Sequence, residues 1–181
     1  MKHTRAALVA ALSIATIGVG AFAPANAATS DGTIVTFELT AGALNVTAPE
    51  TADLGSTAAG SLLVSGDLGT VRVEDDRGFM SILWAASAQS SPFTHESEKA
   101  ELTVPATSVT YTPGAPTDSS GGLAVFVPTP GLLGGTLPLP VMTGVSPLGS
   151  NWVEWDPTLT VALPAQQAVG EYSGTITHSV A

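Results

Sequence analysis

The chain ends, over residues 151–181, with NWVEWDPTLTVALPAQQAVGEYSGTITHSVA. From Thr158 to Leu163, Leu and Val alternate with Thr and Ala, and from Tyr172 to Val180 Ser and Thr take every second position. A period of two is typical of a strand with one buried and one wet face. Residues 164–170 contain Pro and Gly and predict a turn that joins the two strands into a hairpin-like unit. Two strands alone are unstable in water, so the rest of the chain must cover them.

Short strand signals separated by Gly, Pro, Asp and Ser run through the preceding residues. No sustained helical periodicity follows residue 27. Many short strands with such turns indicate an all-β protein, which we expect to be an Ig-like antiparallel β-sandwich. The further predicted strands are Thr33–Leu39, Leu44–Thr47, Ser61–Val64, a strand around Val71 and Val73, Phe79–Ser87, Leu102–Val104, Ser108–Tyr111 and Leu123–Val127.

Residues 112–150 are rich in Gly and Pro and do not alternate regularly. Pro removes hydrogen-bond donors from a sheet and Gly weakens strands, so this region is not expected to supply central strands. We interpret it as a Gly/Pro-rich insertion that contains one strand, Leu123–Val127. Its apolar composition leaves two alternatives open: it packs over an open end of the fold, or it is exposed for a partner.

The first residues predict export. Lys2, His3 and Arg5 precede an apolar run from Ala6 to Phe22, and Ala25-Asn26-Ala27 is a small-residue cleavage signal. This arrangement is typical of a secretory signal peptide over residues 1–27, because the run is short for a membrane span. Residues 28–181 then form a single domain, which is long enough for a real core. We expect an extracellular protein at the cell surface, without membrane insertion after cleavage.

Composition restricts partners and chemistry. Removal of residues 1–27 takes away two of the five basic residues and changes the formal net charge from −10 to −12. Such a charge opposes binding to nucleic acid and to anionic polymers. The chain contains no Cys, which excludes disulfides and thiolate ligands.

No catalytic, cofactor or metal motif is recognisable. His95-Glu96 begins like a zinc-helix motif, but no second His follows four residues after the first. The acidic turn Glu74-Asp75-Asp76 lacks the spacing of an EF-hand loop, so we interpret it as a solvated turn, and whether it binds Ca²⁺ stays open. We therefore expect no enzyme, no cofactor and no metal site.

Several stretches resemble the WxL domain family, secreted surface proteins of Gram-positive bacteria, and in particular its actinobacterial branch. The resemblance runs through most of the chain after residue 27. The stretches are Val71–Gly78 (V-x-V-x-D-D-R-G), Trp84 in the next strand, Ser91–Thr94 (SPFT), Leu102–Gly114 (LTVPATSVTYTPG) and residues 155–180 (WDPTLTV…GEYSGTITHSV).

The resemblance implies a domain that attaches non-covalently to the cell wall, with peptidoglycan as the proposed ligand. In that family a Trp-x-Leu motif occurs in a central strand and again in the last strand. Here the two positions read Trp84-Ala85-Ala86 and His178-Ser179-Val180, so each motif lacks one member. The resemblance therefore supports a domain of the WxL type more strongly than it supports peptidoglycan as the ligand.

Candidate site residues divide into two groups. We interpret Trp84 as a buried ring between sheets, His178 as a packed inward-facing residue, and Tyr172 as a corner tyrosine that hydrogen-bonds the backbone. Trp152 and Trp155 have opposite strand parity, so at most one readily points inward. The candidate ligand-binding residues are Trp152, Trp155, Glu154 and Asp156, where an exposed ring would stack on a sugar and a carboxylate would accept its hydroxyl hydrogen bonds.

The expected function is non-catalytic attachment to a cell-wall polymer. The alternative is a structural, assembly or adhesion protein that binds itself or another surface protein through strand edges and the apolar insertion. The sequence does not identify the polymer or the protein partner, the oligomeric state, or whether the protein stays attached.

Overall fold

The structure is a computed structural model that describes residues 33–40, 42–78, 82–97, 102–146, 149–165 and 167–181. The predicted signal peptide lies outside these residues. The chain divides into two units, residues 1–38 and residues 39–181. Residues 33–38, the described part of the first unit, have no regular secondary structure. The prediction of a strand over Thr33–Leu39 is therefore wrong for the isolated chain.

Strands dominate residues 39–181, and the described residues contain no α-helix. None of their helical segments is long and apolar enough to cross a membrane. The elements are β1 Leu44–Thr47, β2 Leu63–Asp67, β3 Val71–Asp75, β4 Ile82–Ser90, β5 Thr94–His95, η2 Ala106–Ser108, β6 Val109–Thr112, β7 Pro116–Ser120, β8 Val125–Pro128, β9 Gly131–Leu132, β10 Leu139–Ser146, β11 Asn151–Trp155, β12 Thr158–Ala162, β13 Tyr172–Ser173 and β14 Ile176–Val180.

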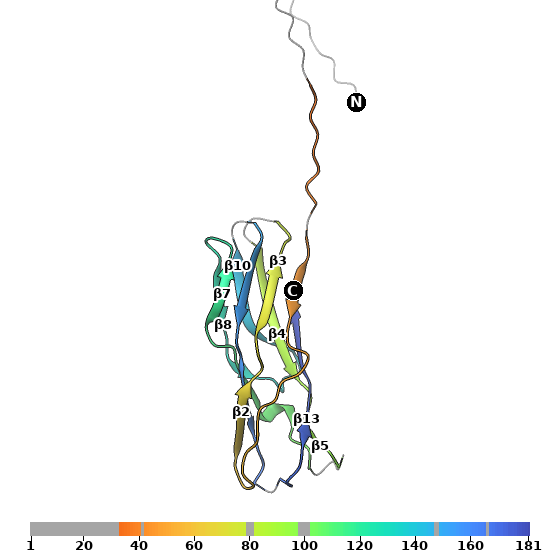
Figure 1. Cartoon of the computed structure of the whole chain (residues 1–181), viewed down its shortest axis with the longest axis vertical. Helices are drawn as coiled ribbons and strands as arrows, with labels where there is room; N and C mark the ends of the chain where they lie inside the picture. Colours follow the sequence, from red (N-terminus) through yellow and green to blue (C-terminus); the bar gives the residue numbers. More distant parts are fainter. Residues whose placement is uncertain (1–32, 41, 79–81, 98–101, 147–148, 166) are drawn as a thin grey trace, which may run out of the picture. The chain divides into compact units, whose positions relative to one another are not determined.

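These strands form antiparallel sheets. Sheet A has the order β1-β3-β11-β7, sheet B has the order β2-β12-β6-β9, and sheet C has the order β14-β4-β10-β8. A two-stranded sheet joins β13 to β5. Figure 1 shows β2, β5 and β13 gathered at one end of residues 39–181. The expected all-β class is confirmed.

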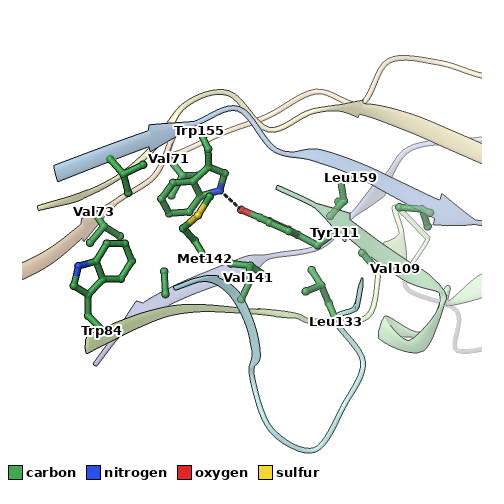
Figure 2. Close-up of a cluster of buried hydrophobic side chains, with 14 of the residues drawn as sticks. Val71, Val73, Trp84, Val109, Tyr111, Leu133, Val141, Met142, Trp155 and Leu159 are labelled. Atoms are coloured by element: carbon green, nitrogen blue, oxygen red, sulfur yellow. Dashed lines mark hydrogen bonds between the residues drawn. The ribbon is translucent and has the colours of Figure 1, made fainter. Parts of the chain in front are cut away.

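One core joins sheets A, B and C. Each sheet points alternate side chains inward, as in the buried–half-buried alternation of β3 and β11. Trp84 and Met142 come from sheet C, and Trp155 comes from sheet A (Figure 2). Tyr111 from sheet B reaches the Trp155 ring, whose Nε1 donates a hydrogen bond to the Tyr111 hydroxyl at 3.1 Å.

The predicted terminal hairpin does not form, although its alternation is confirmed. β12 pairs with β2 and β6, β13 pairs with β5, and β14 pairs with β4. The stretch from Tyr172 to Val180 is interrupted at Gly174, against which the Phe93 ring packs. On both sides of this break the Ser and Thr positions are exposed, and Tyr172, Ile176, His178 and Val180 are half-buried.

The interpretation of residues 112–150 as an insertion with a single strand is wrong. They contribute β7, β8, β9 and β10, and β10 is a central strand between β4 and β8. A central strand tolerates Pro140 because the β4–β10 pairing is irregular between Pro140 and Met142. Gly144 is required there, because the Trp84 ring occupies the space that a Cβ would need. Part of this region packs, since Leu133, Val141 and Met142 are buried.

Other predicted strands differ in their bounds. The strand expected at Ser61–Val64 begins at Leu63 and continues to Asp67, and the strand that contains Trp84 runs from Ile82 to Ser90. Residues 79–81 lie outside the described part. In place of a strand at Leu102–Val104 there is an isolated bridge between Phe93 and Val104.

Candidate functional site

The two C-terminal tryptophans of β11 point to opposite sides of sheet A, as their parity predicts. Trp155 is fully buried and Trp152 is half-buried on the outer side. The expectation of Trp155 as a ligand platform is therefore corrected: its ring lies in the core and its Nε1 is bonded to Tyr111 (Figure 2).

The outer side of β11 is already internally paired around Trp152. The Arg72 guanidinium lies over the Trp152 ring, 4.1 Å from its centroid, and donates a hydrogen bond to Glu154 at 2.8 Å. Hydrogen bonding to Glu154 raises the pKa of Arg72. Asp156 accepts a hydrogen bond from the Thr70 hydroxyl at 2.7 Å. One ring face and two carboxylates that were predicted to meet a sugar therefore have partners within the protein.

The three residues predicted to be structural occupy inward positions. Trp84 is buried, and its Nε1 donates to Asn151 Oδ1 at 3.2 Å. His178 Nε2 lies 3.0 Å from the Tyr111 hydroxyl. The same hydroxyl accepts the hydrogen bond from Trp155, so Tyr111 links Trp155 to His178. Burial lowers the pKa of His178 and raises the pKa of Tyr111, because the charged form of each would lose its hydration.

The acidic turn is built around an ion pair. Asp75 is buried, and Arg77 donates two side-chain hydrogen bonds to it, at 2.8 and 3.0 Å. These hydrogen bonds lower the pKa of Asp75. Among the described residues no group of three or more His, Cys, Asp or Glu side chains is arranged to hold a metal ion.

Within residues 39–181, a cleft of about 690 Å³ is lined by residues that precede β2 and by residues of β13. Figure 1 shows these two strands at the same end of residues 39–181. Residues 52–61, between β1 and β2, line one side, and residues 163–165 and 167–174, after β12, line the other. Val104 and Val161 are buried and form its inner surface together with Phe93 and Val64.

Local hydrogen bonds from backbone N–H groups shape the first wall. Gly55 N donates to Asp53 Oδ1 at 2.8 Å, and Ser61 N donates to the Ala58 carbonyl at 3.0 Å. Leu54 packs its backbone onto Gly66 of β2, where no Cβ intervenes. Ser56 and Thr57 remain on the exposed lining of the cleft.

Two ring side chains brace the second wall. The Tyr172 hydroxyl lies 3.1 Å from the Ala168 carbonyl, so the predicted backbone hydrogen bond is present, and 2.6 Å from Gln167 Oε1. His95 is buried, packs edge-on against Tyr172 and donates from Nε2 to the Val169 carbonyl at 3.1 Å. Gly170 permits this approach, with a φ of 146° and with His95 where a Cβ would lie.

The charged side chains that line the cleft are carboxylates, so the cleft carries negative charge. Asp53 and Glu171 are the charged side chains among the described residues that line it, and neither Lys nor Arg is among them. Apolar inner residues below a rim of hydroxyls and carboxylates suit a neutral or cationic ligand with both apolar and polar groups.

Sequence reasoning missed this cleft, although one signal was available. The connection from Thr47 to Leu63 is fifteen residues, 48–62, and connections of that length without their own secondary structure are uncommon and often functional. Of the predicted site residues, only Tyr172 belongs to the cleft lining. No family model, curated protein or solved structure matches this chain.

Proposed function

We propose that the protein is exported as residues 28–181, folds as an Ig-like β-sandwich of the WxL type, and binds the bacterial cell wall non-covalently through the cleft. The export signal and the resemblance support the location. The cleft beside Phe93 and Tyr172 carries the binding proposal, because it offers a recessed surface with apolar and polar groups side by side.

Peptidoglycan fits this chemistry better than the anionic polymers that accompany it. Its glycan carries N-acetyl groups and its short peptides carry methyl groups, which suit the apolar inner surface. Ser56, Thr57 and Ser173 line the cleft with hydroxyls that both donate and accept hydrogen bonds. Phosphate-bearing polymers would meet Asp53 and Glu171 without a described basic residue in the lining to offset them.

Co-sedimentation with peptidoglycan freed of anionic polymers tests this function. We expect the chain beginning at Ala28 to pellet with the insoluble peptidoglycan and to be competed off by soluble peptidoglycan fragments. A bovine serum albumin control measures trapping in the pellet. Recovery of the protein in the supernatant at every peptidoglycan concentration would reject the proposal.

A further inference from the structure

The outer side of sheet C carries an exposed apolar row that crosses three neighbouring strands. Val125 of β8 lies opposite Val145 of β10, and Val145 lies opposite Leu83 of β4. Their exposed fractions are 58%, 42% and 65%. Val127, two residues along β8 and on the same side, is 48% exposed. Contiguous apolar side chains on an outer sheet face are typical of an interaction site.

The same sheet is uncharged, although the protein is strongly acidic. The sequences of β4, β8, β10 and β14 contain no Asp, Glu, Lys or Arg. Residues 28–181 nevertheless carry a formal net charge of −12. The outer side of sheet A differs, because Arg72 lies there and pairs with Glu74 and Glu154. Depletion of charge together with exposed apolar side chains distinguishes the core of a protein interface from an ordinary solvated face.

The charge distribution favours a second copy of the chain as the partner of this face. A net charge of −12 opposes the approach of an anionic lipid or polymer surface. Two copies repel each other for the same reason, so they approach best where neither presents a carboxylate. Strands of sheet A and of sheet B contain carboxylates, in β3, β11 and β2. A contact of sheet C with sheet C sets no strand carboxylate of one copy against one of the other.

The apolar row is self-complementary about a two-fold axis at Val145. An axis that lies in the plane of the contact and passes through Val145 brings the Val145 side chains of the two copies together. If the axis follows the strands, Leu83 of each copy meets Val125 of the other. If it crosses the strands, Leu83 meets Leu83 and Val125 meets Val125. Both arrangements set row on row, as an isologous dimer requires, and aligned strands are an ordinary way for two sheets to pack.

We propose that two copies of the protein pair face to face through the outer sides of their sheets C, with Val145 at the two-fold axis. The strands of sheet C have nine, four, eight and five residues, and about half of their side chains face outward. A standard interface involves roughly 20–30 residues a side, so this dimer is weak. We expect its dissociation constant to lie between about 10 µM and 1 mM.

Sedimentation equilibrium of the chain beginning at Ala28 measures the dimer. The mass should rise from that of one chain toward that of two between about 10 µM and 1 mM protein. Val145→Asp and Val145→Lys should each prevent the rise, because like charges then meet at the axis. Leu137→Asp and Leu137→Lys are the matched controls, at a position that is 78% exposed and outside sheet C, and should dimerise as the parent does.

An equimolar mixture of the Val145→Asp and Val145→Lys proteins tests the symmetry of the contact. The mixture should recover the dimer, because opposite charges then meet at the axis. Thermal unfolding confirms that each variant is folded. The mass of one chain for the parent at about 1 mM would overturn the proposal, since a dimer in the expected range is populated there. A dimer that persists in both Val145 variants would also overturn it, as would a mixture of the two folded variants that stays monomeric.

Discussion

Gly144 of β10 lies opposite Trp84 of β4, and the indole ring occupies the space that a Cβ on Gly144 would need. The ring nitrogen Nε1, one of the ring atoms nearest to Gly144, donates a hydrogen bond to Asn151 of β11. A glycine in a Gly/Pro-rich stretch and a tryptophan sixty residues earlier therefore form one packing unit between sheets A and C.

Gly144→Ala should destabilise the fold by about 1–3 kcal/mol, the usual cost of overpacking a core. Trp84→Ala should cost about 3–5 kcal/mol through the cavity that it leaves. In the double variant the alanine methyl meets no ring, so the combined loss should be smaller than the sum of the two. Urea unfolding of the four proteins measures this, and strict additivity would show that the two residues do not act as a unit.

Tyr172→Phe should lower the free energy of unfolding by about 1 kcal/mol, because it removes the hydroxyl contacts with Ala168 and Gln167. The same loop lines the cleft, so peptidoglycan binding should weaken while the sheets stay intact. Urea unfolding and co-sedimentation of the same preparation report both effects. An unchanged unfolding midpoint would leave Tyr172 without a bracing role.

Acidification should destabilise the protein through His178. Burial lowers its pKa in the folded state, whereas the unfolded side chain takes up a proton near about pH 6.5. Below that pH the unfolded state binds more protons, so stability falls as the pH decreases toward the lower folded-state pKa. His178→Gln keeps a polar group near Tyr111 but does not titrate.

The measurement is the free energy of unfolding of both proteins between about pH 7 and pH 5. The parent should lose more stability over this range than the His178→Gln variant. Asp75 does not interfere, because its pKa is lowered by Arg77, so its contribution is lost only below about pH 4. Identical pH dependence in the two proteins would contradict a half-buried His178 that stays neutral in the folded state.

Anionic polymers in the cell wall should weaken binding of the protein to the wall. A formal net charge of −12 for residues 28–181 repels them, so removal of these polymers should strengthen binding. Salt screens the repulsion, so added salt should strengthen binding to untreated wall more than to stripped peptidoglycan. Weaker binding after stripping would point to the polymers themselves as the ligand.

Local alternation was sufficient to predict much of this fold. The side chains of β3, β12 and β14 face inward at the positions where parity placed them, including His178. In β11 only one of Trp152 and Trp155 is buried, as parity requires, but parity did not tell which. Strand partners were not predictable in this way, because pairing depends on contacts between distant residues. Tyr172–Val180 thus reads as one strand of a hairpin but divides between β5 and β4 at Gly174.

The prediction for residues 112–150, an insertion with one strand, failed for a related reason. Pro and Gly weaken strands on average, but Pro140 lies at an irregular point of the β4–β10 pairing and Gly144 makes room for Trp84. Neither compensation is visible without the partner strand. The opposite error concerns Thr33–Leu39, where the sequence predicts a strand but the described residues have no regular secondary structure.

The central claim is that the cleft binds the wall, and three variants test it most directly. Thr57→Trp fills the cleft from an exposed lining position, and Thr136→Trp places the same bulk at an exposed position outside it. Trp152→Ala removes the ring that lies under Arg72. All three changes lie at exposed or half-buried positions, and thermal unfolding confirms that each variant is folded.

The decisive measurement is the dissociation constant of each variant for peptidoglycan stripped of anionic polymers, determined by quantitative co-sedimentation. We predict that Thr57→Trp weakens binding about tenfold or more, while Thr136→Trp and Trp152→Ala bind as the parent does. Full binding by Thr57→Trp together with loss of binding by Trp152→Ala would contradict the cleft and place the ligand on the outer side of β11.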